Sequence, residues 1–141
     1  KDTLALWSSE YSIKLRDRFK CTVVNVQQQA SQQESVQNFS ANKLEPSTAG
    51  LGEHKVTQQD ANVILALFNP ARHELRSHAG YKIDILQNNY RSLKILKNRD
   101  GEENVRVALY FDGASNTLKE LPHYKDPKME KIYEHFSGDS R

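Results

Sequence analysis

Two cations stand at the end of a strand-like segment, immediately before a tight turn. The segment reads SLKILKNRDGEENVRVALYFDG over residues 92–113, and Lys97 and Arg99 precede its Asp100-Gly101 turn. Residues two apart on a strand leave the same face, so we expect these two side chains to lie side by side. An ammonium and a guanidinium placed in this way can hold a phosphate or a carboxylate. The alternative is a charged sheet edge that prevents aggregation, and the two residues taken alone favour it.

Other residue patterns that carry chemistry are weak or absent in the sequence. The glycines form no G-x-x-x-x-G-K-[ST] phosphate loop, and no G-x-S-x-G nucleophile motif is present. The run VALYFD ends in Asp112 as a Walker B strand does, but a strand that enters a turn explains this acid more simply. The five His lack metal-ligand spacing and the single Cys21 excludes a Cys-based zinc site, so we assign no metal ligands. Residues 27–29, all Gln, follow an apolar run at a place where α/β sheets bind ligands, although an ordinary loop start explains them better.

The composition is that of one globular domain. The chain has 141 residues, of which 37% are apolar and 27% charged, and its net charge of +2 says little about partners. No run of about 18 apolar residues is present, so we predict no membrane-spanning helix. The first residues, KDTLALWSSEY, show neither an initiator Met nor a signal peptide. We therefore expect a fragment or processed piece in a reducing, cytoplasmic setting.

The N-terminal part predicts a helix followed by a buried strand. The helix covers residues 3–18, where apolar side chains recur at spacings of three and four: Leu4, Trp7, Tyr11 and Leu15. Asp2 is its expected N-cap, and cations near its end complement the helix dipole. Residues 21–26, CTVVNV, predict a buried β-branched strand in which Cys21 is a small buried residue. Residues 27–59, rich in Gln, Ser and Asn, are expected to form a long polar loop.

The rest of the chain predicts further strands and a final helix. Residues 62–68, NVILALF, form an apolar strand that Asn69-Pro70 ends. The later elements are, in order, helical turns within 71–90, hairpin strands at 91–97 and 104–111, a short strand at 116–121 and a helix at 127–136. This order predicts an α/β fold, with a mixed sheet that has helices on its faces and a C-terminal β-hairpin.

Four segments, in this order, resemble the C-terminal half of the RecA-like ATPase core (a P-loop NTPase) of replicative DNA helicases. The family is the DnaB-like, superfamily 4 type of bacteria and phages. The segments are CTVVNVQQQAS, KLEPSTAGLGEHKVTQQDANVILALF, YRSLKILKNRDGEENVRVALYF and GASNTLKEL. The resemblance covers about residues 12–122 and implies that residues 1–122 belong to the helicase ATPase domain, with 123–141 as a C-terminal helix and tail. Each motif is moderately specific, and their order and spacing carry the resemblance.

The resemblance implies catalytic roles for three side chains. Gln28 matches a Gln at the end of a strand that senses nucleotide state and reports it to a DNA-binding loop. Lys97 and Arg99 match a Lys-x-Arg pair that reaches the nucleotide site of the neighbouring subunit in a ring. Arg99 is then expected to act as an arginine finger that stabilises charge on the transferring phosphoryl group.

The resemblance also implies contacts with single-stranded DNA. They come from the loop before the second apolar strand, through three residues: Gly52, Glu53 and Lys55. The run Gln59-Asp60-Ala61-Asn62 then matches the family's Gln-Asp-Ala-Asp with one change at Asn62. Two features depart from the family, because Lys55 stands where it tends to have Gly, and residues 71–90 resemble a lineage-specific insertion.

The complete protein is therefore expected to be a ring-forming DNA helicase, with a homohexamer as the expected ring, that uses ATP and Mg²⁺ and translocates on single-stranded DNA. The chain lacks the Walker A and Walker B segments, so alone it is expected to hold no cofactor and to be inactive. Two alternatives stay open. One is a RecA-like ATPase in recombination or DNA packaging, and the other is a non-enzymatic DNA-binding or assembly fragment. No membrane partner is expected.

Overall fold

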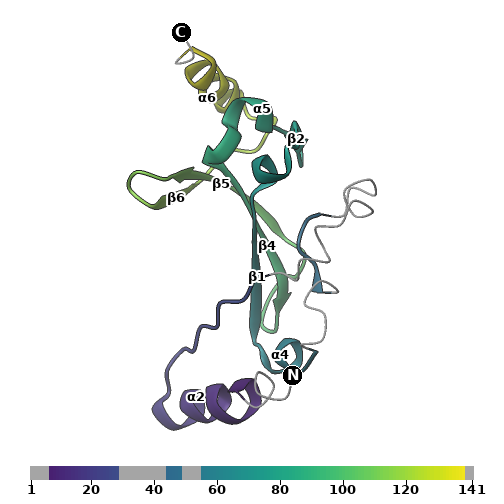
Figure 1. Ribbon diagram of the computed structural model, residues 1–141, viewed down its shortest axis with the longest axis vertical. Coiled ribbons are helices and arrows are strands. Elements are labelled where there is room, and N and C mark those ends of the chain that lie inside the picture. Colours follow the sequence, from purple (N-terminus) through teal and green to yellow (C-terminus); the bar gives the residue numbers. More distant parts are fainter. Residues whose placement is uncertain (1–6, 29–43, 49–54, 139–141) are drawn as a thin grey trace. The chain divides into compact units, whose positions relative to one another are not determined.

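The computed structural model describes residues 7–28, 44–48 and 55–138 (Figure 1). The chain divides into two compact units, residues 1–64 with 96–103 and residues 65–95 with 104–141. The predicted N-cap Asp2, the apolar Leu4 and the loop residues Gly52 and Glu53 lie outside the described residues.

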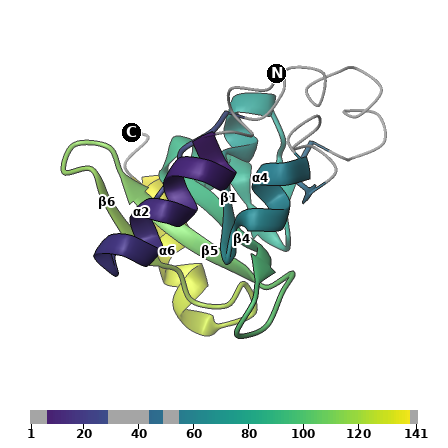
Figure 2. The ribbon, with the colours of Figure 1, turned by 90° about the horizontal axis from the view of Figure 1, so that it is seen from below.

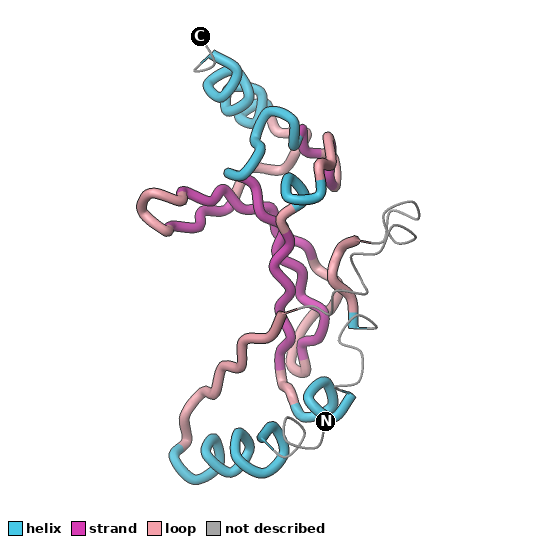
Figure 3. The backbone as a smooth tube through the Cα atoms, viewed as in Figure 1, coloured by secondary structure: helices cyan, strands magenta, loops and turns pink. Residues whose placement is uncertain are grey.

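Four strands form the main sheet, in the order β1-β4-β5-β6 (Figures 1 and 3). They are β1 (Val63–Phe68), β4 (Tyr90–Asn98), β5 (Arg106–Asp112) and β6 (Thr117–Glu120), so the predicted strand, hairpin and last short strand are confirmed. Tyr90 lies opposite Tyr110 in the β4–β5 pair, and Leu109 lies opposite Glu120 in the β5–β6 pair. The α/β class is confirmed, but the sheet is antiparallel rather than mixed. The reason is that β4, β5 and β6 follow one another through short turns, whereas parallel neighbours need long crossovers.

A glycine and an asparagine shape the connection between β4 and β5. The backbone N–H of Gly101 donates to the Asn98 carbonyl at 3.4 Å, and a Cβ at Gly101 would lie 2.6 Å from Asn98 Nδ2. Asn104 adopts a left-handed conformation with a φ of 61°. Asn104 N donates to the Ile95 carbonyl at 2.7 Å while Ile95 N donates to the Val105 carbonyl at 2.8 Å. Two residues thus oppose Ile95, which makes a β-bulge at the start of the second hairpin strand.

The core of the second unit is formed by the sheet and the helices α5 (Ile83–Leu86) and α6 (Pro127–Gly138). Its buried side chains are Tyr81, Ile83, Leu86, Tyr90, Ala108, Leu121, Met129 and Tyr133. The predicted C-terminal helix is confirmed, because Met129 and Tyr133 are buried and Ile132 and Phe136 pack against the same cluster. Burial raises the pKa of the Tyr81 hydroxyl, which donates to the Pro122 carbonyl at 3.0 Å.

The segment before β4 is built into this core. It consists of η4 (Pro70–His73), the short strands β2 (Ser77–His78) and β3 (Tyr81–Lys82), α5, and η5 (Gln87–Asn89), which confirms the predicted helical turns. Gly80 has a φ of +89°, and a Cβ there would lie 2.6 Å from the Tyr124 ring. The Tyr90 hydroxyl, fully buried, lies 3.2 Å from His78 Nδ1. The predicted insertion therefore supplies part of the packing of the second unit.

The first described segment of the first unit is helical, as predicted for this part of the chain. The π-helical segment η1 (Trp7–Ser12) continues into α2 (Ile13–Phe19). Its apolar side chains recur at helical spacing but remain exposed, and they are Trp7, Tyr11, Leu15 and Phe19. The helix α4 (Lys55–Asp60) lies beside η1 (Figure 2). The end of the predicted polar loop is therefore helical.

The predicted buried strand at residues 21–26 is wrong. Residues 21–28 form no regular structure, and Val24 and Val26 are exposed. Cys21 is exposed as well, against the expectation of a buried thiol. The β-branched run favours an extended backbone, but a strand also needs a neighbour for its N–H and C=O groups. The described sheet contains no strand that pairs with this segment.

Candidate functional site

The two cations of the hairpin meet the end of a helix. Lys97, the last residue but one of β4, sends its Nζ to the carbonyl oxygens of Gln58 at 2.7 Å and Gln59 at 3.1 Å. Arg99 follows in the turn, and one of its terminal nitrogens donates to the same Gln59 oxygen at 3.3 Å. The two side chains lie side by side at this shared acceptor, as expected, although Arg99 belongs to the turn and not to the strand. These two side chains and the C-terminal end of α4 are called the cation cluster below.

The chemistry of a helix end explains why cations gather here. The last four carbonyls of a helix have no partner within the helix, and the helix dipole makes this end negative. Gln58 and Gln59 lie in the last turn of α4, so their carbonyls are such acceptors. Lys97 and Arg99 satisfy them with charged donors, and the chain segments that meet are about 40 residues apart in sequence. The cation cluster thus holds α4 against the β4–β5 hairpin.

Backbone contacts fix the hairpin end at the same place. Arg99 N donates to the Asn62 carbonyl at 3.0 Å, so the turn is tied to the residue before β1. Within the turn, Asn98 N donates to Glu103 Oε1 at 3.3 Å. Because its backbone is held in this way, Arg99 has a defined position although its side chain is exposed.

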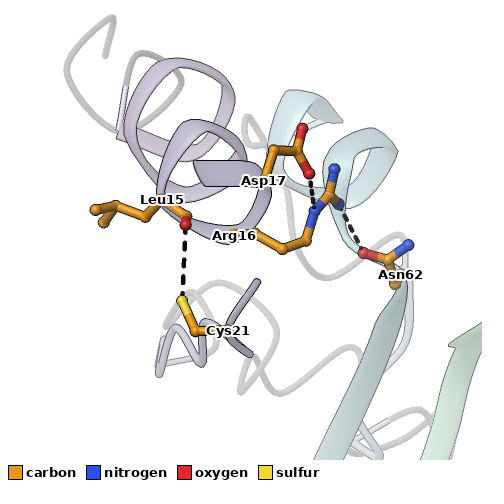
Figure 4. Close-up of polar contacts among 5 residues, drawn as sticks. All are labelled: Leu15, Arg16, Asp17, Cys21 and Asn62. Carbon is orange, nitrogen blue, oxygen red and sulfur yellow. Dashed lines mark hydrogen bonds and ion pairs between the residues drawn. The ribbon is translucent and has the colours of Figure 1, made fainter. Parts of the chain in front are cut away.

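A third cation reaches this region from α2 (Figure 4). Arg16 donates from Nη1 to Asn62 Oδ1 at 3.0 Å and from Nε to Asp17 Oδ1 at 2.8 Å. The hydrogen bond from Arg16 lowers the pKa of the Asp17 carboxyl, and the same bond raises the pKa of Arg16. Sequence reasoning noted Arg16 only as one of several cations near a helix end. It missed the pairing with Asn62, because a contact between residues 46 apart leaves no local signal.

Of the other predicted site residues, the structure describes Gln28 and Lys55. Gln28 is exposed at the end of an irregular segment rather than at the end of a strand. The described hydrogen bonds include none that joins Gln28 to Lys97 or Arg99. Lys55 is the first residue of α4, and Gly52 and Glu53 lie outside the described ranges.

Asp112 has a structural explanation. Its carboxylate accepts hydrogen bonds from Ser115 Oγ at 2.6 Å and from Ala114 N at 3.0 Å. These bonds, that from Ser115 first, lower the pKa of the Asp112 carboxyl. Asp112 therefore organises the β5–β6 turn, in line with the simpler of its two interpretations.

The described part of the chain offers neither a metal site nor a membrane span. It contains no group of three or more His, Cys, Asp or Glu residues that could hold a metal ion. None of its helices has the length and apolar character that a membrane span requires.

The cation cluster presents two positively charged side chains beside the end of one helix. Lys97 is partly buried, and its ammonium group donates to two carbonyls at the end of α4. Arg99 is exposed, its side chain donates to the Gln59 carbonyl, and a guanidinium carries five N–H donors. Arg99 therefore has donors left for an oxyanion that approaches from outside. Comparison of the chain with known protein families, with curated proteins and with solved structures finds no match, so the helicase resemblance stays a prediction.

Proposed function

We propose that the chain is part of an ATP-dependent, ring-forming DNA helicase, within a RecA-like core that the complete protein possesses. In this proposal the exposed guanidinium of Arg99 reaches the ATP and Mg²⁺ bound by a neighbouring subunit of the ring, a hexamer in the cytoplasm. It stabilises the charge that develops as the γ-phosphoryl group transfers. The loop around Gly52, Glu53 and Lys55 contacts the backbone of single-stranded DNA.

The observation that carries the proposal is the meeting of two motifs. Gln59 belongs to the Gln-Asp-Ala-Asn run, and Arg99 belongs to the Lys-x-Arg pair of the hairpin. The two segments lie about 40 residues apart in sequence, and the Arg99 guanidinium donates to the Gln59 carbonyl at 3.3 Å. Two segments that belong to the same resemblance thus lie in contact, which supports the proposal.

The same contacts suggest how the nucleotide site could be linked to the DNA-binding loop. Lys97 and Arg99 both hold the last turn of α4, and α4 begins at Lys55, the last of the three predicted DNA-binding residues. If a phosphate draws the Arg99 guanidinium away from the Gln59 oxygen, α4 loses one of its terminal partners. The helix then passes the change to the loop that it follows. This linkage requires Lys97 to stay bound as the fixed support.

The test measures three properties of the complete protein: ATP hydrolysis, its stimulation by single-stranded DNA, and strand displacement. A helicase hydrolyses ATP, is stimulated by single-stranded DNA, and displaces an annealed strand. DNA-stimulated hydrolysis without strand displacement favours the recombination or packaging ATPase. Absence of hydrolysis in the assembled complete protein overturns both ATPase proposals.

A specific observation favours one second candidate, a non-enzymatic assembly module. The donors of Lys97 already satisfy two helix carbonyls, as a purely structural lysine would. In addition, apolar side chains on η1, α2 and β1 remain exposed, among them Tyr11, Phe19 and Leu65. Fluorescence anisotropy with labelled single-stranded DNA and with labelled protein partners separates this candidate, because such a module binds with an affinity that ATP does not change.

A further inference from the structure

The dipeptide Asp-Gly occurs twice in the chain, each time at a turn between two strands. Asp100-Gly101 lies in the β4–β5 turn, whereas Asp112 is the last residue of β5 and Gly113 opens the β5–β6 turn. An aspartate before a glycine can rearrange without an enzyme, because glycine has no side chain that keeps its amide nitrogen away from the carboxyl carbon. The two copies have the same local chemistry, so a difference in their reactivity comes from the fold.

The rearrangement joins the aspartate carboxyl group to the backbone amide that follows it. At the first copy, the Gly101 nitrogen attacks Cγ of Asp100, a bond forms between these atoms, and the carboxyl OH leaves with the amide proton as water. A second water molecule then opens the five-membered imide. When it attacks the main-chain carbonyl carbon of Asp100, the bond from that carbon to the nitrogen breaks and isoaspartate results. Isoaspartate has the mass of aspartate, but its chain continues through Cβ and Cγ.

The carboxylate of Asp100 is free to approach the nitrogen that attacks it. Asp100 and Gly101 are both exposed, and within the described ranges of the chain no residue bonds to the Asp100 carboxylate. The Gly101 N–H donates to the Asn98 carbonyl at 3.4 Å, which is longer than the about 2.9–3.0 Å of a usual hydrogen bond. The carboxyl group can therefore turn toward the nitrogen without first breaking a side-chain bond.

The carboxylate of Asp112 is held away from the same reaction. It accepts hydrogen bonds from Ser115 Oγ at 2.6 Å and from Ala114 N at 3.0 Å, and the Asp112 backbone is paired with Thr117 in the sheet. Cyclisation at Gly113 requires these bonds to break. The same bonds, that from Ser115 first, lower the pKa of the Asp112 carboxyl. The group therefore stays in its charged form, which is the less reactive one, over a wider range of pH.

We propose that Asp100-Gly101 is a site of spontaneous isomerisation in the folded chain, and that the fold protects Asp112-Gly113. The reaction needs no partner except water. Isoaspartate at residue 100 adds one methylene group to the main chain directly after Arg99, so it lengthens the turn in which Arg99 N donates to the Asn62 carbonyl. The proposal is independent of the proposed helicase function, because it concerns the chemistry of the turn and not hydrolysis of ATP.

Peptide mapping of the aged chain is the test. The folded chain is incubated at neutral pH and physiological temperature, and trypsin, which cleaves after Arg106, then places the two sites on different peptides. Electron-transfer dissociation identifies isoaspartate by the fragments of its longer backbone. We expect isoaspartate to form at least about tenfold faster at residue 100 than at 112, because cyclisation at Asp112 first breaks the bond from Ser115. In the chain unfolded with guanidinium chloride, the two sites should react at similar rates.

Two variants separate the causes, and circular dichroism establishes that each is folded. Gly101→Ala places a side chain beside the attacking nitrogen and should suppress isoaspartate at residue 100 without changing the rate at 112. Ser115→Ala should raise the rate at 112 several-fold and leave the rate at 100 unchanged.

Three results would count against the proposal. Equal rates at the two sites of the folded wild-type chain, or a faster reaction at 112, would overturn it. Absence of isoaspartate at residue 100 in the folded chain, under conditions in which the unfolded chain forms it, would also overturn it. A folded Ser115→Ala chain whose rate at 112 stays at the wild-type value would exclude the Ser115 bond as the source of protection.

Discussion

Removing the Lys97 ammonium should loosen the helix that it contacts. We consider Lys97→Met, which keeps an unbranched apolar stem and deletes the donor that bonds the Gln58 and Gln59 carbonyls. A hydrogen bond from a charged group contributes about 1.5–3 kcal/mol, and a cation at a helix C-terminus adds about 0.3–1 kcal/mol. Lys97 is only partly buried, so solvent takes over some of this interaction. We therefore expect α4 to lose about 1.5 kcal/mol of local stability.

Amide hydrogen exchange measures this loss where it occurs. A change of about 1.4 kcal/mol is tenfold in an equilibrium constant, so the opening of α4 should become about tenfold more frequent. The informative amides are those of Gln59 and Asp60, which have a carbonyl four residues earlier within the helix. Their exchange rates should rise about tenfold in Lys97→Met, whereas amides of the second unit keep their rates.

The matched control is Lys131→Met, which removes an exposed lysine of α6 and should leave the exchange of α4 unchanged. Exchange at Gln59 and Asp60 that stays within about twofold of the wild-type rate in Lys97→Met would refute the reasoning. Such a result would mean that the ammonium does not hold α4 in solution. The fixed support on which the proposed linkage depends would then be missing.

Two further predictions concern the second unit. Met129 is fully buried in the core, so Met129→Ala should lower the free energy of unfolding by about 2–5 kcal/mol and lower the urea midpoint. Met129→Leu should lower it by less than about 1.5 kcal/mol. Equal urea midpoints for the two variants would contradict the packing. The hydrogen bond from Ser115 is the main cause that lowers the pKa of the Asp112 carboxyl in the folded state. Its contribution to the stability of the turn is therefore fully present at a pH above the unfolded-state pKa of about 3.9. This contribution is lost as the pH falls through the lower pKa of the folded state. An NMR titration should find the Asp112 midpoint below that value and closer to it in Ser115→Ala, and a midpoint that does not move would exclude the bond as the cause.

Local patterns predicted the β4–β5 hairpin and the C-terminal helix well. The hairpin followed from two apolar runs around Asp100-Gly101, and the observed strands end within two residues of the predicted ones. The C-terminal helix followed from an apolar face at helical spacing, which docks on the core through Met129 and Tyr133. These elements are specified by residues close together in sequence, so their pattern is visible before the fold is known.

The contacts of the first unit depend on residues that are distant in sequence. CTVVNV has the composition of a strand, yet it has no neighbouring strand in the described sheet, and composition cannot supply one. The helix α4 arises from KVTQQD, at the end of a polar stretch without an apolar periodicity. The closeness of the Lys97 and Arg99 side chains was predictable, but their target at the Gln58 and Gln59 carbonyls was not.

In the proposed helicase, Arg99 serves a nucleotide that is bound by a neighbouring subunit. The most direct measurement is DNA-stimulated ATP turnover by the complete protein with Arg99→Ala, beside Arg72→Ala as a control at an exposed arginine of η4. We predict that Arg99→Ala lowers turnover by about 10³-fold or more while the affinity for ATP stays nearly unchanged, and that Arg72→Ala hydrolyses ATP at the wild-type rate. Wild-type turnover by the Arg99→Ala protein would contradict the claim.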